Sequence, residues 1–192
     1  MPPKAKFTKE EITAAALNIV KNSGADALTA RSLGNKLGSS ARPVFTVFSG
    51  MEEVQSEVVS AAKAVYKNYL DYGMEEYPAF KGVGKAYIKF AAEQPNLFRL
   101  LFMREQNNLP DLSNILGRLD DSKGKILSSI QTEYGLNEAA ASALYLHLWI
   151  YAHGIAVLIV TKVCSFTPEQ ISEMLTQVFS GLIKKIKTEG KL

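Results

Sequence analysis

The chain has 192 residues, of which 47% are hydrophobic and 21% are charged, and its formal net charge is +3. This composition can fill a hydrophobic core, so it excludes a disordered, collagenous or low-complexity chain and fits one large domain or a core with a small module. A single cysteine and two histidines exclude a disulfide framework and a Cys-rich zinc site. We therefore expect a reducing, cytoplasmic compartment and neither a metal nor another cofactor.

Positive charge is concentrated at the front of the chain. Up to Phe48 there are seven Lys and Arg residues and three Asp and Glu residues, an excess of four positive charges. The net charge of the whole chain is too small to indicate nucleic acid, but this uneven distribution favours an anionic partner for the N-terminal region.

The first predicted helix has a complete start. Thr8 is placed as its N-cap and Glu11 as the capping-box partner, while Phe7 and Ile12 form a hydrophobic staple. Apolar residues then recur with helical spacing until the chain reaches Gly24, a residue typical of helix ends.

Two shorter helices are predicted next. The first begins after Thr29 as N-cap and ends at Gly38, and the second runs from about Ala41 to Phe48 with Pro43 in its first turn. Two short helices joined by a glycine turn fit the helix-turn-helix design. The same arrangement also occurs in many α-helical proteins that never touch DNA, so the spacing alone leaves both interpretations open.

A helix-turn-helix unit places the start of its second helix in the major groove of DNA. We expect Val44, Phe45 and Phe48 to face inward and Arg42 to read guanine, because its guanidinium can donate hydrogen bonds to O6 and N7 together. The remaining DNA-side residues are expected to contact phosphates or line the groove: Lys4, Lys6 and Lys9 in the leading arm, then Thr29, Lys36, Ser39, Ser40, Ala41 and Thr46.

The rest of the chain also predicts helices, so the expected fold class is all-α. It comprises an N-terminal three-helix helix-turn-helix domain at 1–51 and a larger helical bundle for regulation and dimerisation at 52–192. The later helices are expected over 52–72, 80–93, 95–104, 111–134, 137–163 and 167–187.

One segment challenges a soluble fold, because residues 139–161 contain no charged side chain and are long enough to span a bilayer. Ser142, His147 and His153 lie within it, and polar groups are costly at membrane depth. We therefore favour a buried helix over a membrane anchor. His153 is expected to be a hydrogen-bonded core group, and Cys164 a small buried hydrophobe.

The N-terminal sequence closely resembles the DNA-binding domain of the TetR family of transcriptional regulators. The resemblance lies in residues 12–17 (ITAAAL), Gly24, 28–33 (LTARSL), 36–38 (KLG), 44–49 (VFTVFS) and 52–54 (EEV). Residues 94–102 (QPNLFRLLF) look like a common segment of the regulatory domains of this family. Trp149 with His153 and Gly154 resembles the signature of its WHG-type subclass.

This resemblance implies a homodimeric repressor that binds palindromic operator DNA and is released by a small molecule. The helices at 137–163 and 167–187 would form the subunit interface as a four-helix bundle. The chain departs from the family at Phe45, Val47 and Met51, where Tyr, His and Lys are usual and would donate to phosphates. Either the lysine arm compensates, or the operator is unusual, or DNA binding is weakened or lost.

A small-molecule effector would need an apolar cavity with a few polar tips. The candidate lining residues are Tyr66, Tyr87, Phe98, Phe102, Met103, Tyr145, Trp149 and His153. For any one of them taken alone, ordinary core packing is the favoured explanation, and the cavity is what the family resemblance implies. Enzyme motifs are absent, since Gly82-Val83-Gly84 lacks a third glycine and a preceding strand. The alternative function is a TetR-like ligand-binding or interaction protein that no longer reads DNA.

Overall fold

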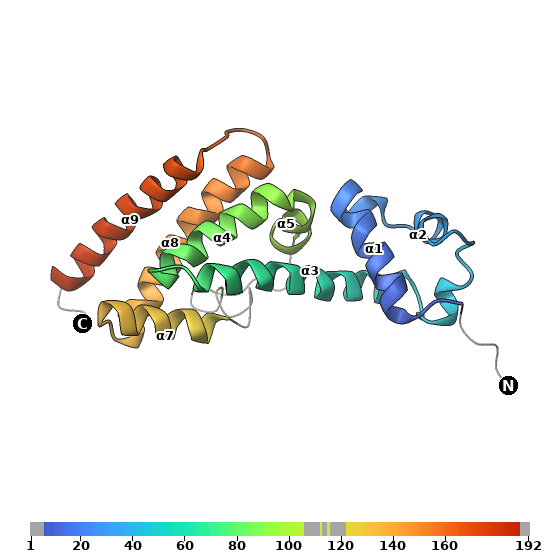
Figure 1. Cartoon of the computed structure of the whole chain (residues 1–192), viewed down its shortest axis with the longest axis horizontal. Helices are drawn as coiled ribbons and strands as arrows, with labels where there is room; N and C mark the ends of the chain where they lie inside the picture. Colours follow the sequence, from blue (N-terminus) through green and yellow to red (C-terminus); the bar gives the residue numbers. More distant parts are fainter. Residues whose placement is uncertain (1–5, 106–111, 113–114, 116–121, 189–192) are drawn as a thin grey trace. The chain divides into compact units, whose positions relative to one another are not determined.

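The computed structural model describes residues 6–105, 112, 115 and 122–188, and within them it is helical with no strand. The all-α class is therefore confirmed for this part of the chain. The elements are α1 (Lys9–Ser23), η1 (Ala25–Ala27), α2 (Ala30–Lys36), η2 (Val44–Thr46), α3 (Met51–Met74), α4 (Ala79–Glu93), α5 (Pro95–Phe102), α7 (Lys123–Tyr134), α8 (Glu138–Val160) and α9 (Pro168–Thr188) (Figure 1).

The chain divides into two compact units. Unit 1 contains Met1–Val65 and Gln94–Glu105, and unit 2 contains Tyr66–Glu93 and Gln106–Leu192. The division falls inside α3, so the first part of α3 belongs to unit 1 together with α5. The functional domains expected at 1–51 and 52–192 remain a prediction.

Unit 1 is organised by helix caps that the sequence predicts. The Thr8 hydroxyl accepts from the backbone N–H of Glu11 at 3.1 Å, and the Glu11 carboxylate accepts from the N–H of Thr8 at 2.8 Å. At α2, Thr29 and Ser32 form a second reciprocal pair. These side chains satisfy N–H groups that have no partner inside the helix, so the start of each helix is fixed.

Unit 2 is built around α8, which packs against α4, α7 and α9. Nine residues of α8 are buried, and the buried face of α4 includes Phe80, Tyr87 and Phe90. The end of α3 approaches α4 so closely that a Cβ atom on Gly82 would lie 2.0 Å from the carbonyl oxygen of Gly73. Glycine is therefore required at this helix crossing.

By length and composition α8 is also long and apolar enough to cross a membrane. No other helix in the described ranges meets this criterion. Helices at the core of soluble proteins share these properties, and α8 buries one side against its neighbours in unit 2. Cys164 follows α8 and is exposed, so the expectation that it is buried is wrong. It lies in the segment that leads to α9, where the chain has left the bundle core.

Candidate DNA-binding surface and effector cavity

The recognition segment, residues 39–48, does not form the α-helix predicted over 41–48. It contains only the 3₁₀ helix η2, and four successive N–H groups, from Val44 to Val47, donate to the carbonyl three residues earlier. The cause is local, because Pro43 disfavours α conformation at Arg42 and the following β-branched and aromatic residues are weak α-helix formers. A 3₁₀ helix is tighter and has three residues per turn.

This geometry changes which side chains face solvent. Val44 is fully buried, whereas Arg42 and Phe45 are exposed. Phe45 retains 45% of its accessible surface, so its predicted inward position is wrong. The inward positions of Val44 and Phe48 are confirmed, since Phe48 is 2% exposed. Phe45 donates to the Arg42 carbonyl three residues earlier, and residues three apart are eclipsed in such a turn, so Phe45 follows Arg42 to the outside. Phe48 lies beyond η2 and donates to the Val44 carbonyl four residues earlier, so it does not continue this exposed side.

The recognition segment is seated directly on α2. A Cβ atom on Gly34 would lie 2.8 Å from both the amide nitrogen of Ala41 and the carbonyl carbon of Ser40. No side chain fits between these backbones, so Gly34 allows the close approach that fixes the start of the segment. The Thr46 hydroxyl also donates to the Pro43 carbonyl at 2.7 Å, and this hydrogen bond within the segment stabilises the turn.

The other predicted DNA-side residues differ in exposure and in their contacts. Lys36, Ser40 and Thr46 are exposed, while Ser39 and Ala41 are half-buried. Lys6 and Ser39 are brought together, since the Lys6 ammonium donates to the Ser39 hydroxyl at 3.1 Å. Thr29 is exposed, but its hydroxyl already caps α2. Lys4 lies outside the described residues.

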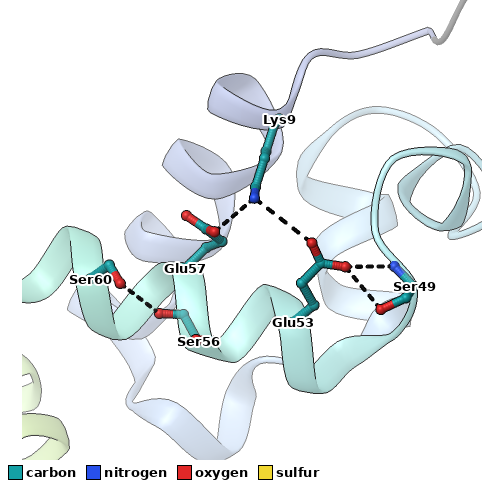
Figure 2. A network of polar contacts seen from close by, with 6 residues as sticks. All are labelled: Lys9, Ser49, Glu53, Ser56, Glu57 and Ser60. Atoms are coloured by element: carbon teal, nitrogen blue, oxygen red, sulfur yellow. Dashed lines mark hydrogen bonds and ion pairs between the residues drawn. The ribbon is translucent and has the colours of Figure 1, made fainter.

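Lys9 differs from the other predicted DNA-side residues, because its ammonium is paired with carboxylates. Its ammonium lies 2.7 Å from the Glu57 carboxylate and 3.7 Å from that of Glu53, both on α3 (Figure 2). The same Glu53 carboxylate accepts from the backbone and the hydroxyl of Ser49, at 2.8 and 2.9 Å. Lys9 also lies 5.5 Å from the centre of the Phe48 ring. Lys9 is thus engaged by α3, and the phosphate contact expected of it stays a prediction.

These contacts shift the pKa values of Lys9 and Glu53. The hydrogen bond to Glu57 raises the pKa of Lys9, and the hydrogen bonds from Ser49 lower the pKa of Glu53. Both shifts favour the charged forms of Lys9 and Glu53. The network joins the start of α1, the end of the recognition segment and the first turns of α3 within unit 1.

Unit 2 contains a cavity of about 280 Å³. Four residues predicted as ligand contacts lie in its wall: Tyr66, Tyr87, Tyr145 and Trp149. Its other lining residues come from the end of α3, from α4, α7, α8 and α9 and from the turn before α4: Leu70, Pro78, Phe80, Lys81, Val83, Gly84, Tyr134, Leu148, Ala152, Leu175, Thr176, Phe179 and Ser180. The wall is therefore mostly apolar and aromatic with a few polar tips, as small-molecule sites usually are.

His153 lies behind this wall and orients one of its members. Its Nδ1 atom is 2.8 Å from the hydroxyl oxygen of Tyr87. Burial raises the pKa of Tyr87 and lowers that of His153, so at neutral pH the imidazole is uncharged and the phenol can donate to it. The Trp149 ring stacks on His153 at 5.1 Å and 23°. The hydrogen bond expected for His153 is present, but its side chain is half-buried rather than fully buried in the core.

The other predicted ligand contacts are elsewhere. Phe98 is fully buried, and its ring packs against Phe102 at 5.1 Å, whereas Met103 is 40% exposed. All three belong to α5 or the residue after it and lie in unit 1, so none lines the cavity of unit 2. Apolar character alone could not distinguish these positions from true cavity residues.

Sequence reasoning missed the contribution of α7 and α9 to the cavity. Tyr134 and Phe179 form one side, with ring centres 4.9 Å apart, and burial raises the pKa of Tyr134 to about 12. Lys81 is the cationic member of the wall. Which residues border an unfilled volume depends on how several helices meet, and the pattern within one helix does not specify this.

Comparison with known proteins extends these observations. Residues 80–182, more than half of the chain, match the family described as "Tetracyclin repressor-like, C-terminal domain". A Clostridium perfringens protein described as a fatty acid metabolism regulator has a similar fold, with a TM-score of 0.55 and 16% identity over 90% of this chain and 96% of that one. No curated protein matches the sequence. The chain therefore belongs to the TetR family of transcriptional regulators.

Proposed function

We propose that this protein is a homodimeric regulator that binds palindromic operator DNA through unit 1 and a small molecule through the cavity of unit 2. The observation that carries the proposal is the exposed Arg42 side chain on a segment anchored by α2. Among the described residues Arg42 has no ion-pair partner, so its guanidinium is available to a guanine edge. DNA binding, dimerisation and ligand binding are typical of the family.

Phosphate contacts would position the protein on the duplex. Lys6 and Lys36 are exposed cations of unit 1, and Lys6 already reaches the recognition segment through Ser39. Such contacts fix register and supply affinity that falls with salt, whereas base contacts supply sequence preference. Two copies related by a two-fold axis would read half-sites about 34 Å apart, one turn of the duplex.

Dimerisation is supported by the outer side of α8. Seven exposed positions along it and at its C-cap contain no Lys, Arg, Asp or Glu and recur at intervals of four or three residues, which is the spacing of a helix–helix seam. Ile150 and Leu158, at 47% and 38% exposure, are its largest side chains. The positions are Ala139, Ala143, His147, Ile150, Gly154, Leu158 and Thr161. A four-helix bundle formed by α8 and α9 of two protomers would cover this surface.

The cavity supports a compact apolar effector. An engineered cavity of about 150 Å³ accommodates benzene, so a site of about 280 Å³ fits a molecule of one or two rings, or a short alkyl chain of similar size. A ligand that favours a spacing of the two recognition segments unsuited to the operator shifts the population of dimers away from the DNA-bound form. We propose that the protein is a cytoplasmic repressor released in this way, with no enzymatic activity of its own.

The test is a comparison of two arginine variants in DNA binding. We expect Arg42→Ala to weaken binding to a selected operator by about 1 to 3 kcal/mol and to relax its sequence preference. Arg99→Ala, an exposed arginine of α5, is the control and should leave binding unchanged. The salt dependence of wild-type binding is measured in parallel.

Absence of salt-dependent DNA binding by the wild type would contradict the proposal. It would favour the second function, a ligand-binding or interaction protein that has lost DNA reading. The side chains of Phe45, Val47 and Met51 favour that alternative, because none of them can donate a hydrogen bond to a phosphate.

A further inference from the structure

We propose that Phe45 is a second base-reading side chain, and that it contacts the 5-methyl group of a thymine within about two base steps of the guanine read by Arg42. This inference rests on the proposed DNA-binding function. It assigns a specificity role to a residue whose aromatic ring offers no polar group to a phosphate.

The 3₁₀ geometry places the side chains of Arg42 and Phe45 one above the other along the helix axis, an arrangement called a column below. The N–H of Phe45 donates to the carbonyl of Arg42 at 3.2 Å, and residues three apart in a 3₁₀ helix are eclipsed. The three columns of the segment differ in exposure. Val44 anchors the inner column, whereas Arg42 and Phe45 form an exposed outer column and Thr46 is exposed at its side.

An exposed aromatic ring has a natural partner in the major groove. Thymine is the one base that presents a methyl group there, and apolar side chains such as Phe recognise it by contact. A 3₁₀ helix rises about 2.0 Å per residue, so Arg42 and Phe45 are separated by about 6 Å along its axis. Successive base pairs are about 3.4 Å apart, so the guanine and the thymine should lie within about two steps of each other.

The column is held in place before DNA arrives. Gly34 seats the start of the segment on α2, the Thr46 hydroxyl bonds the Pro43 carbonyl, and the Glu53 carboxylate holds Ser49 just past its end. Contacts on both sides of Phe45 therefore fix the backbone that carries it. A ring on such a backbone loses little conformational freedom on binding, which favours recognition through so small a group as a methyl.

The experiment begins with duplexes that the full-length protein selects from a random-sequence pool. Each thymine of the recovered half-site is then replaced by uracil, which lacks only the 5-methyl group, and affinities are measured for wild type, Phe45→Ala and Arg42→Ala. A buried methyl is worth about 0.8 kcal/mol, which corresponds to about a fourfold change in affinity per half-site and about 15-fold for both half-sites.

We expect one thymine position, near the guanine enriched in the selected half-sites, at which uracil weakens wild-type binding by about fourfold per half-site. Phe45→Ala should bind less tightly and lose the difference between thymine and uracil, while Arg42→Ala should keep it. Thermal unfolding of Phe45→Ala verifies folding, which an exposed position should leave intact.

Two results would overturn the inference and are distinguishable. If a sequence is recovered but wild type is indifferent to uracil at every thymine, Phe45 does not read a methyl and the regulator function stands. If the pool yields no enriched sequence and binding shows no salt dependence, the proposed function fails and the role of Phe45 fails with it.

Discussion

The recognition segment of unit 1 and the cavity of unit 2 are held by different kinds of contact. In unit 1, capping side chains, Gly34 and the contacts of Lys9 and Glu53 fix a short surface segment through polar groups and backbone. In unit 2, aromatic side chains that are distant in the sequence surround a volume that none of them fills. Local polar contacts can be recognised in a sequence, whereas a cavity exists only after the helices have packed.

The largest expected effect tests the closest backbone contact of unit 2. Gly82→Ala adds a Cβ atom that would overlap the Gly73 carbonyl, so α3 and α4 must separate. We expect the free energy of unfolding to fall by about 3 kcal/mol, measured by chemical denaturation. Gly124→Ala is the control, since a Cβ atom there meets no neighbour within 4 Å, and it should be neutral or slightly stabilising.

The corresponding change in unit 1 is Gly34→Ala. The added Cβ atom would press on the backbone of Ser40 and Ala41, and we expect a loss of about 2 kcal/mol in stability. Because the displaced backbone carries Arg42, operator affinity should fall as well, as measured by DNA titration of the folded variant. Unchanged DNA binding would show that the seat on α2 does not position the recognition segment.

A smaller effect is expected from the helix caps of unit 1. Thr8→Ala removes the acceptor for the Glu11 N–H at the start of α1, and this should cost about 1 kcal/mol in the free energy of unfolding. Thr8→Ser keeps a hydroxyl acceptor and serves as the matched control. Equal stability of the two variants would show that the reciprocal cap contributes nothing.

The smallest effect concerns pH and unit 2. Burial lowers the pKa of His153 below 6.5, so the unfolded chain binds more protons than the folded chain as pH falls through that value. Stability should therefore decrease on acidification below about pH 6.5 and level off once the folded state is also protonated. Thermal unfolding compared at about pH 7.5 and about pH 5.5, about one unit either side of that value, should show a smaller decrease in stability for His153→Gln than for the wild type. An identical decrease in both proteins would contradict it.

The sequence predicts unit 1 in more detail than unit 2. The starts of α1 and α2 follow from Thr8 and Thr29, because a cap depends on residues within one helical turn. The same reasoning failed at Phe45, where Pro43 and β-branched neighbours convert the expected α-helix into a 3₁₀ helix and change the direction of the ring.

In unit 2 the helices expected over 80–93, 137–163 and 167–187 are present as α4, α8 and α9. The helix expected over 111–134 is present as α7 from Lys123, and most of its earlier residues lie outside the described ranges. The cavity was predicted only in part. Tyr66, Tyr87, Tyr145 and Trp149 were anticipated through the family resemblance, whereas Tyr134 and Phe179 were not. Whether an aromatic residue fills the core or borders a void depends on interhelical distances, which residue spacing within one helix does not specify.

Cys164 gives the molecule an experimental property that its sequence position alone did not indicate. It is the single cysteine of the chain, and its side chain is exposed between α8 and α9. A nitroxide attached to this thiol would mark each protomer once, without any engineered substitution. In the proposed dimer, the distance between the two labels could be measured by electron paramagnetic resonance, with and without a candidate effector. A change in that distance would reveal a rearrangement of the two protomers.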